Sequence, residues 1–275
     1  KNYLNINHPI VKIIVEKERL GTGGMLCTIK NFETDIIVTY CDIYFKINID
    51  NIIDQFQRNN TYDSLLFVHP NNHPHDSDVL LINHNNRLRG IRKKNTYQNR
   101  PVKNITNAGF FLFRKNYFIN EKGNTKTNLE EVIKNNIKLN NHVYLSCEYM
   151  KDMGTPQRLN EVNTDINNGK GNRLSGENKR IAVFLDRDGV INKEKGRISK
   201  IEEFEIYKNI HKPIKKLNDQ GILVIVITNQ PVIARGDINF HGLKMIHNKL
   251  EYELGRNGAY IDDILFCPHH PDKGF

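Results

Sequence analysis

The triplet Asp186-Arg187-Asp188 places two carboxylates two positions apart, directly after the apolar run Ile181–Leu185. Aspartates at this spacing leave the end of a strand pointing the same way, so both can reach one phosphate group. One carboxylate can attack the phosphorus atom, while the other protonates the leaving oxygen and later activates water. A Mg²⁺ ion would reduce the electrostatic repulsion between the carboxylates and the phosphate. The pattern therefore predicts phosphoryl transfer in which one of Asp186 and Asp188 is the nucleophile and the other is the general acid/base.

A second apolar run, Ile222–Ile227, ends in Thr228, Asn229 and Gln230. We expect the hydroxyl of Thr228 and the amide of Asn229 to donate hydrogen bonds to the equatorial oxygens of the phosphate. Two aspartates at a strand end could also be no more than a solvated turn. The succession of buried strand, DxDGV, helix, buried strand and TNQ is a much narrower pattern, and it favours the phosphate site.

A parallel sheet is needed to bring these residues together. The run Ile181–Leu185 has the length and composition of a strand that is covered on both faces. Helices are predicted over Ile210–Gln220, where Gly221 fits the stop, and near Phe240–Leu254, and a further strand over Ile261–Phe266. Open parallel sheets bind ligands at the carboxyl ends of their strands, so the site is expected at that edge.

The stretches FLDRDGVIN, VITNQPVIARG and CPHHPDKGF resemble the heptose-bisphosphate and histidinol-phosphate phosphatases of the haloacid-dehalogenase superfamily. They are most similar to the D-glycero-D-manno-heptose 1,7-bisphosphate 7-phosphatases, from Arg180 to the chain end. The resemblance implies Asp186 as nucleophile and Asp188 as acid/base, with Mg²⁺ on Asp186 and on the backbone carbonyl of Asp188. It also implies phosphate contacts from Thr228, Asn229 and Gln230, and substrate contacts from the loop Glu194–Arg197, Arg197 included.

Two further features leave alternatives open. Arg235 either orients its loop or meets substrate, or is a plain surface arginine, and Pro231-Val232 stands where the family has Ser-Gly. Cys267 and His269 could ligate Zn²⁺, but a structural zinc site needs four ligands, so the residues alone favour a loose loop. The resemblance implies a zinc site completed by a downstream Cys-x-Cys pair. The family's last motifs would also lie beyond Phe275, so we expect a chain cut at both ends with an incomplete zinc site.

The N-terminal half holds a different set of candidates. A glycine-rich stretch follows an expected strand over Val11–Glu16 and opens a short helix, and it consists of Gly21, Thr22, Gly23 and Gly24. Glycines let the backbone approach a ligand, and a helix N-terminus offers N–H groups to an anion, although glycines also form ordinary turns. Asp42, after the strand-like run Asp35–Tyr40, and the distant Asp152 suit a Mg²⁺ ion that bridges nucleotide phosphates. Each could instead be a turn residue.

The stretches LGTGG, HPHDSD, NAG and YMKDMGTP resemble sugar-1-phosphate nucleotidyltransferases, and most of all the D-glycero-D-manno-heptose 1-phosphate guanylyltransferases, over roughly residues 11–165. The resemblance implies a GT-A-like, Rossmann-like domain in which Asp42 and Asp152 bind the metal. It implies nucleotide contacts from Gly21, Thr22, Gly23 and Gly24, and sugar contacts from Asn107, Ala108 and Gly109. Three departures stand out: the family's GGxGTRL loop is absent, Cys41 replaces a Gly, and Asn128 replaces an Asp. Lys94 is the best placed basic residue for the sugar phosphate, although a solvated hairpin accounts for most of its basic neighbours.

Composition limits the possible partners. The chain of 275 residues has a net charge of +9, but its Lys and Arg are spread along the sequence rather than gathered in an arm. We therefore expect phosphorylated sugars and a nucleoside triphosphate as partners, and no nucleic acid. No apolar run is long enough to cross a bilayer, and four cysteines without paired spacing do not indicate disulfides. These features predict a cytoplasmic protein with no membrane contact.

The polar segment Asp165–Arg180, rich in Gly and Asn, divides the chain. We predict a nucleotidyltransferase domain over 1–164, a linker over 165–179 and a phosphatase domain over 180–275, each an α/β domain with a largely parallel sheet. The two halves fit consecutive steps of nucleotide-activated heptose synthesis. The alternatives are a mannose-1-phosphate guanylyltransferase fused to a histidinol-phosphate-type phosphatase, and a non-catalytic ligand-binding fragment.

Overall fold

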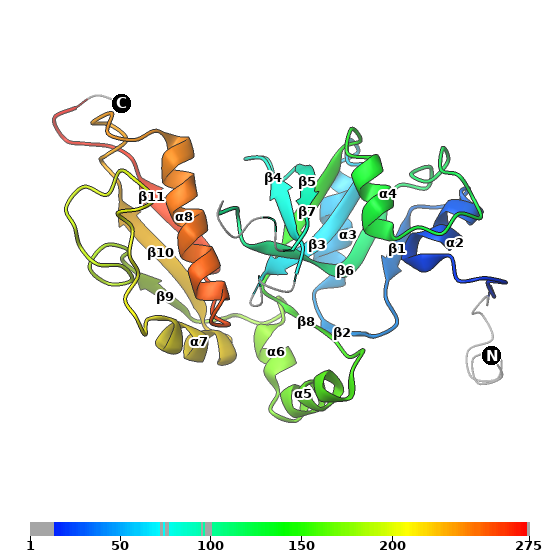
Figure 1. Ribbon diagram of the computed structural model, residues 1–275. Helices are drawn as coiled ribbons and strands as arrows, with labels where there is room; N and C mark the ends of the chain where they lie inside the picture. The colour runs from blue at the N-terminus through cyan, green and yellow to red at the C-terminus, as the bar shows by residue number, and fades with distance from the viewer. Residues whose placement is uncertain (1–13, 72–73, 75–76, 95, 97–100, 274–275) are drawn as a thin grey trace.

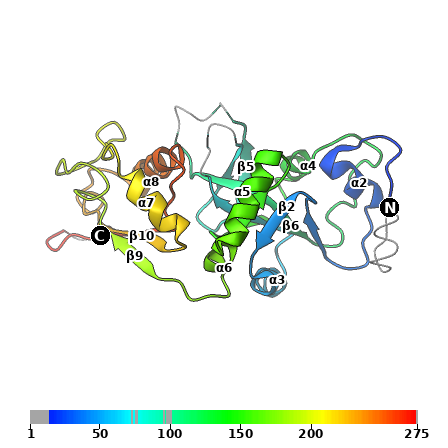
Figure 2. The same ribbon diagram turned by 90° about the horizontal axis from the view of Figure 1, so that it is seen from below.

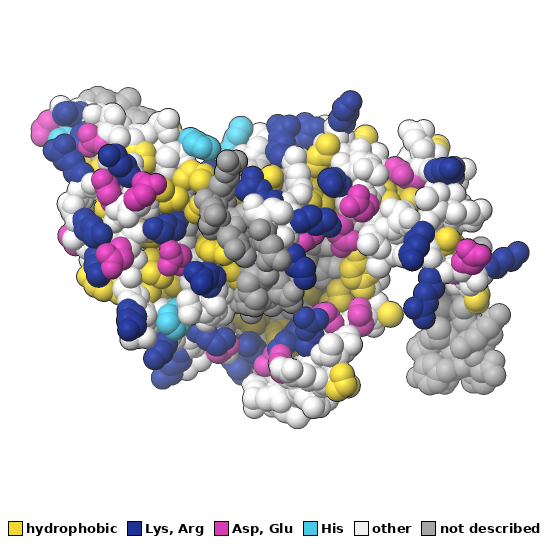
Figure 3. Space-filling view, in the orientation of Figure 1, with side chains coloured by type: hydrophobic (Ala, Val, Ile, Leu, Met, Phe, Trp, Pro, Cys, Tyr) yellow, Lys and Arg dark blue, Asp and Glu magenta, His cyan; other side chains and the backbone are white. Residues whose placement is uncertain are grey.

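The computed structural model describes residues 14–71, 74, 77–94, 96 and 101–273, which form two α/β bodies lying side by side (Figure 1). The strand expected over Val11–Glu16 lies partly outside these residues, and the described part, Ile14–Glu16, is not a strand. On the face shown in Figure 3, the Lys and Arg side chains are scattered over both bodies. None of the helices in the described part is long and apolar enough to cross a membrane.

The main sheet of the N-terminal body has the order β1 (Ile36–Thr39), β6 (Ile105–Phe113), β3 (Ser64–Pro70) and β7 (Asn141–Leu145). Strand β6 runs antiparallel to both of its neighbours, and only β3 and β7 are parallel. The prediction of a largely parallel sheet is therefore wrong for this body. The reason is the connection: the hairpin of β4 (Val79–Ile82) and β5 (Leu88–Arg92) stands between β3 and β6, so the chain returns without a crossover helix.

Both faces of this sheet are covered, because successive side chains of a strand point to opposite sides. Phe111 and Phe113 of β6 enter one core, together with α2 (Gly21–Ile29) and α4 (Leu129–Asn135). Ala108, Phe110 and Leu112 enter the other core, together with α3 (Ile49–Arg58). A two-stranded ribbon of β2 (Ile43–Lys46) and β8 (Tyr149–Asp152) continues the structure beyond the sheet. The antiparallel ribbon brings the segment after Cys41 beside the segment before Gly154.

The C-terminal body is a three-stranded parallel sheet in the order β11 (Asp263–Cys267), β10 (Leu223–Asn229), β9 (Ala182–Leu185). Its helices are α7 (His211–Asp219) and α8 (Phe240–Gly255). The predicted strands and helices of this half are confirmed to within two residues at each end. Gly221 takes the left-handed conformation after α7, with a φ of 75°, as the predicted stop requires.

Helices α7 and α8 pack on the same side of this sheet (Figure 2). Val224, Val226 and Ile264 face them and belong to the core that includes Ile214 of α7 and Ile246 of α8. On the opposite side Phe184 is 59%, Ile227 47% and Leu265 49% exposed. The expectation that the Ile181–Leu185 strand is covered on both faces is therefore wrong for the described chain, because no described helix lies on that second face.

The segment expected to be a linker is largely helical. It contains the end of α5 (Pro156–Asn167) and all of α6 (Lys170–Leu174). Helix α5 begins at a capped end, where the Thr155 hydroxyl accepts a hydrogen bond from the Arg158 N–H and Pro156 occupies the first turn. Leu174, one of the few apolar residues of the segment, is buried.

The two bodies are joined by specific contacts in addition to the chain connection. Asn104, before β6, donates from its backbone N–H to Glu251 Oε2 of α8 at 3.0 Å and from its side chain to the Glu251 carbonyl at 3.3 Å. Its side-chain amide also donates to the Asn71 carbonyl at 2.6 Å. Lys170 of α6 forms an ion pair with Asp219 of α7 at 2.9 Å. The junction is thus a packed and partly buried interface.

Gly255→Ala is expected to destabilise this junction. A Cβ atom at Gly255 would lie 2.3 Å from Asn104 Nδ2 and 2.4 Å from the Asn71 carbonyl oxygen, so the interface has to shift. We expect a loss of about 1–3 kcal/mol in the free energy of unfolding, measured by urea titration. The matched control is Gly90→Ala, whose Cβ would meet only Leu81 at 3.5 Å. Equal stability of the two variants would contradict the packed junction.

Candidate active sites

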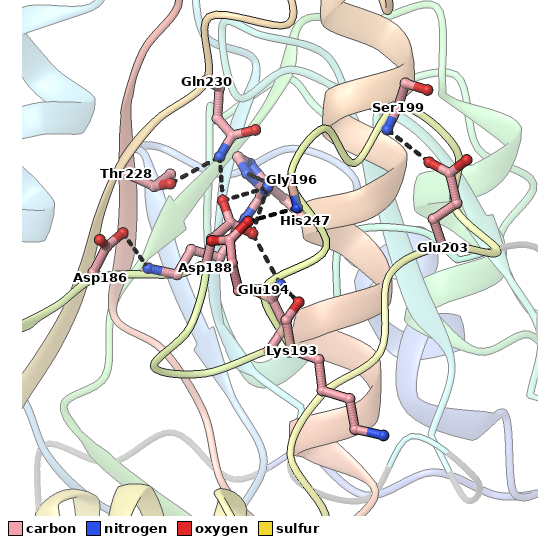
Figure 4. Close-up of polar contacts among 12 residues, drawn as sticks. Asp186, Asp188, Lys193, Glu194, Gly196, Ser199, Glu203, Thr228, Gln230 and His247 are labelled. Carbon is pink, nitrogen blue, oxygen red and sulfur yellow. Dashed lines mark hydrogen bonds and ion pairs between the residues drawn. The ribbon is translucent and has the colours of Figure 1, made fainter.

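The predicted phosphate site lies at the carboxyl edge of the C-terminal sheet (Figure 4). Asp186 follows β9 directly, and Thr228 and Asn229 end the neighbouring parallel strand β10. Arg187 N–H donates to Asp186 Oδ1 at 2.7 Å, which orients this exposed carboxylate. Thr228 is buried, and its hydroxyl accepts a hydrogen bond from Gln230 Nε2 at 2.9 Å. The fold therefore gathers these four predicted residues at one edge.

The carboxylate of Asp188 accepts hydrogen bonds from three side chains. Oδ2 accepts from Gln230 Nε2 at 2.8 Å, and Oδ1 accepts from Asn192 Nδ2 at 2.9 Å. Arg187 donates to both oxygens, with Nη2 at 3.0 Å from Oδ1 and 2.9 Å from Oδ2. Asp188 is thereby held in one orientation. Asn192, in the same motif, is a functional candidate that the analysis of the sequence did not single out.

Arg187 and His247 form a second layer behind Asp188. The Arg187 side chain is only 1% exposed, and its Nη1 lies 3.3 Å from Nε2 of His247 on α8. Its guanidinium also lies over the ring of Phe204, 5.6 Å from the centroid. The sequence offers no signal for His247, since only the fold brings this helix residue to a motif 60 positions earlier.

Burial, together with the charge of Arg187, lowers the pKa of His247 to about 3. In the unfolded chain this imidazole has an ordinary pKa of about 6.5, so below that pH it binds a proton that the folded state does not bind. The contribution of this residue to the free energy of unfolding is therefore fully present above pH 6.5. It is lost as pH falls toward 3, by at most about 1.4 kcal/mol per pH unit. We expect urea unfolding at pH 7.0, 5.5 and 4.5 to show a smaller pH-dependent loss in His247→Gln than in the wild type. Parallel pH profiles would contradict a buried neutral imidazole.

The loop between the first motif and α7 lies close to the segment after Gln230. Arg197 Nη1 is 3.7 Å from Asp237 Oδ2, and the Arg197 side chain is 63% exposed. Glu194 folds back onto its own turn, where Oε1 accepts from the Gly196 N–H at 2.7 Å. Arg235 is half-buried on the VIARG turn. The loop of Arg197 and the loop of Arg235 therefore approach each other through the Arg197–Asp237 pair.

The Cys267 and His269 side chains lie at the end of β11. Cys267 Sγ is 3.5 Å from Nδ1 of His269, and both side chains are accessible. Within the described residues, no group of three or more His, Cys, Asp or Glu side chains is arranged to hold a metal ion. The structure brings together the two predicted ligands, and zinc binding remains a proposal.

The N-terminal candidates other than the glycine-rich stretch line a cavity of about 890 Å³. Its walls include Asp42, Lys94, Asn107, Ala108, Gly109 and Asp152. Lys215 and Asp219 of α7 also line it, so the C-terminal body forms part of the wall. The motif HPHDSD lies partly outside the described residues, but its last residue, Asp78, lines the cavity and pairs with Lys93 at 3.0 Å.

Asp42 and Asp152 face each other across the space left by Gly154. A Cβ atom at Gly154 would lie 3.0 Å from Asp152 Oδ1 and 3.1 Å from Asp42 Oδ2. The antiparallel pairing of β2 with β8 sets this arrangement, since Ile43 is opposite Asp152. Asp152 Oδ1 also accepts a hydrogen bond from the Gly154 N–H at 2.5 Å, and carboxylate oxygens are ligands that Mg²⁺ prefers. Arg158 forms an ion pair with Asp152 and balances part of the negative charge.

Glu130 is a candidate in this cavity that the sequence did not reveal. Its Oε1 accepts hydrogen bonds from the Tyr40 hydroxyl at 3.0 Å and from Asn107 Nδ2 at 3.4 Å. Burial and the charge of Glu130 raise the pKa of Tyr40, so its hydroxyl stays protonated as a donor. Asn107 in turn accepts from the Gly109 N–H at 3.1 Å. Glu130 therefore fixes the NAG motif from the start of α4.

The glycine-rich stretch does not line the cavity. Gly21, Thr22, Gly23 and Gly24 open α2 and pack against the segment before α4: Gly23 N–H donates to the Thr127 carbonyl at 3.0 Å, and the Thr22 hydroxyl accepts from the Leu129 N–H at 3.0 Å. A Cβ atom at Gly21 would lie 2.5 Å from the Thr127 oxygen. Close packing of α2 on α4 therefore accounts for the small residues here.

Comparison with known proteins adds to this geometry. No protein-family model matches the chain. Over 95 residues the sequence is 43% identical to the D-glycero-alpha-D-manno-heptose-1,7-bisphosphate 7-phosphatase of Photorhabdus laumondii, covering 34% of this chain and 52% of the relative. Over 92 residues it is 36% identical to the corresponding beta-heptose enzyme of Haemophilus ducreyi, covering 33% and 50%. The similarity to heptose-bisphosphate phosphatases lies in the C-terminal part of the chain. The chain spans about half the length of these curated relatives.

Two solved structures align with parts of the chain. The D,D-heptose 1.7-bisphosphate phosphatase from B. bronchiseptica, complexed with magnesium and phosphate, is 32% identical over 34% of this chain and 54% of that chain, with a TM-score of 0.33. HddC from Yersinia pseudotuberculosis, complexed with GMP-PN, is 19% identical over 60% of this chain and 72% of that chain, with a TM-score of 0.49.

Proposed function

We propose that the C-terminal body hydrolyses the 7-phosphate of D-glycero-D-manno-heptose 1,7-bisphosphate. The observation that supports this most strongly is the placement of Asp186 and Asp188 at the carboxyl edge of a parallel sheet, within a segment that is 43% identical to a 7-phosphatase. Thr228, Asn229 and Gln230, at the neighbouring strand end, would bind the phosphate, and Arg197 and Arg235 the rest of the substrate.

In this proposal the Asp186 carboxylate attacks phosphorus, and the bond from phosphorus to the sugar oxygen breaks. Asp188 gives its proton to that oxygen, so the sugar leaves as an alcohol and Asp186 bears the phosphoryl group. Asp188 then takes a proton from water, whose oxygen attacks phosphorus and releases inorganic phosphate and free Asp186. Mg²⁺, held by the Asp186 carboxylate and the Asp188 backbone carbonyl, would supply the positive charge that lets these anions meet.

We propose that the N-terminal body transfers a nucleotidyl group, GMP from GTP foremost, to heptose 1-phosphate with release of pyrophosphate. The pair Asp42 and Asp152, facing each other at the cavity wall, supports this role as a Mg²⁺ site for a nucleotide. Asn107, Ala108, Gly109 and Lys94 would bind the sugar phosphate. The start of α2, with Gly21, Thr22, Gly23 and Gly24, would contact the nucleotide from outside the cavity.

We place the boundary between the two activities in the segment 165–179 that contains α6. Cys267 and His269 would be two of four ligands of a structural Zn²⁺ ion. A nucleoside triphosphate and phosphosugars are the expected partners, and the cytoplasm, where both are made and used, is the expected location.

Substrate assays test both activities. Phosphate release from each anomer of heptose 1,7-bisphosphate, compared with histidinol phosphate, tests the phosphatase. Pyrophosphate release with each of the four NTPs, with heptose 1-phosphate compared with mannose 1-phosphate, tests the transferase. A preference for histidinol phosphate and mannose 1-phosphate would assign the chain to the alternative fusion. No turnover of any of these compounds would leave a ligand-binding role.

A further inference from the structure

The buried guanidinium of Arg187 connects two parts of the C-terminal body that are far apart in sequence. On one side Nε and Nη2 donate to Asp188, with Nε 3.2 Å and Nη2 3.0 Å from Oδ1. On the other side Nη1 lies 3.3 Å from Nε2 of His247, which is 8% exposed on α8. Arg187 is itself 1% exposed. The residue therefore links the orientation of Asp188 to the position of a core helix.

Burying a guanidinium is costly unless its donors are used, because the charge leaves water. Replacing such a buried ion pair by apolar residues often leaves stability unchanged or increases it, so the pair is weakly justified by stability alone. What the fork geometry of Arg provides is a fixed direction for a carboxylate, since two parallel N–H groups bind both oxygens. Arg187 uses its fork on Asp188 in this way, with Nε 3.2 Å from Oδ1 and Nη2 2.9 Å from Oδ2.

His247 determines which way the guanidinium points. An arginine has donors and no acceptor, so Nε2 of His247 has to accept and the imidazole proton has to lie on Nδ1. The ring also contacts Phe266 edge-on, with the centroids 5.7 Å apart, and this packing fixes its plane. The burial described above keeps the imidazole neutral and therefore able to accept.

We propose that Arg187 and His247 are positioning residues of the phosphatase, and that they act by holding the Asp188 carboxylate in the orientation its proton transfers require. The inference rests on the proposed hydrolysis of a phosphate monoester and not on the identity of the sugar. Neither side chain touches the substrate in this account. General acid/base groups contribute roughly 10²–10⁴-fold to a rate, and a small misplacement removes about 10²-fold of it.

The test compares two substitutions of His247 in the full-length protein, assayed on p-nitrophenyl phosphate and on heptose 1,7-bisphosphate. The amide oxygen of His247→Gln can still accept from Arg187, whereas His247→Leu cannot. We expect kcat to fall about 10- to 100-fold in His247→Leu, with KM changed less than about threefold. His247→Gln should stay within about threefold of the wild type. Equal kcat in the two variants, or a change confined to KM, would overturn the proposal.

A double-variant cycle shows whether the effect passes through Asp188. In an Asp188→Asn background the loss caused by His247→Leu should largely disappear, because the carboxylate to be held is gone. Multiplicative losses would instead indicate an independent role and overturn the proposal. Thermal unfolding of each variant shows whether the fold is retained.

The tautomer of His247 gives a readout that needs no activity. Long-range ¹H–¹⁵N NMR of the wild type at pH 7 should show the proton on Nδ1 and a bare Nε2. A proton on Nε2 overturns the proposal even if His247→Leu fails to fold. If the wild type turns over neither phosphate ester, the proposed function fails, while the NMR result still decides whether the Arg187–His247 pair exists.

Discussion

Asp186→Asn is expected to abolish hydrolysis of heptose 1,7-bisphosphate, with a loss in kcat on the order of 10⁴-fold or more. An amide cannot form the acyl-phosphate, but it is isosteric with the carboxylate and its oxygen can still accept from the Arg187 N–H, which lies 2.7 Å from Oδ1. Asp186 is exposed at the end of β9, so the substitution removes chemistry with little change in packing. Phosphate release under single-turnover conditions measures the loss.

The matched control for this variant is Asp263→Asn. Asp263 is also an exposed aspartate of the same sheet, at the amino end of β11, where Oδ1 accepts from the Ile264 N–H at 2.8 Å. This variant should keep wild-type turnover. Nucleotidyl transfer should be unchanged in Asp186→Asn, because Asp186 is not among the residues that line the N-terminal cavity. Substantial phosphatase turnover in Asp186→Asn would show that another group is the nucleophile.

Asp42→Ala and Asp152→Ala should each reduce nucleotidyl transfer by about 10³-fold while phosphate release continues. The two carboxylates converge on the space beside Gly154, and loss of either leaves a Mg²⁺ ion with one protein ligand in place of two. Asp152→Asn is the better second variant at that position, because it keeps a polar partner for Arg158. Pyrophosphate release at several Mg²⁺ concentrations measures the effect, which excess Mg²⁺ should partly restore.

Gly154→Ala probes the same site without removing a ligand. Its Cβ atom would lie about 3 Å from an oxygen of each aspartate, at 3.0 and 3.1 Å, and would occupy the space in which the ion is proposed to bind. Transfer should fall in this variant as well. Asp54→Ala is the control, since Asp54 is an exposed helix residue paired with Arg58 at 3.0 Å. Full transfer activity in Gly154→Ala and in both aspartate variants would show that the metal does not bind at this position.

The C-terminal half was the more predictable from sequence. Strand β10 is an apolar run bounded by Gly221 and by the polar residues from Thr228 on, so the sequence predicts both its length and its carboxyl end. The edge at which Asp186 and Thr228 meet then followed from the parallel order of the strands. The pairing of Arg187 with His247 could not be predicted in this way, because it depends on the rotation of α8 against the sheet.

In the N-terminal half the local signals were present but the long-range arrangement was not. The direction of β6 depends on the hairpin before it, and residue patterns within β6 are the same for either direction. The helix start at Thr155-Pro156 is a recognisable signal, but the polar composition that follows it favoured a linker instead. Glu130 was missed since its role arises from contacts to Tyr40 and Asn107, which lie far from it in sequence.

The hydrogen bonds of Asn104 couple the local unfolding of the two bodies. Its backbone N–H and its side-chain amide both donate to Glu251 of α8, and the amide also donates to the Asn71 carbonyl of the N-terminal body. If either body unfolded alone, buried polar groups of the other would lose their partners at once, at about 1–3 kcal/mol for each group. Native-state hydrogen exchange would therefore find the segment around Asn104 and the end of α8 opening as one cooperative unit. The two bodies then share a folding unit at their junction and do not unfold independently there.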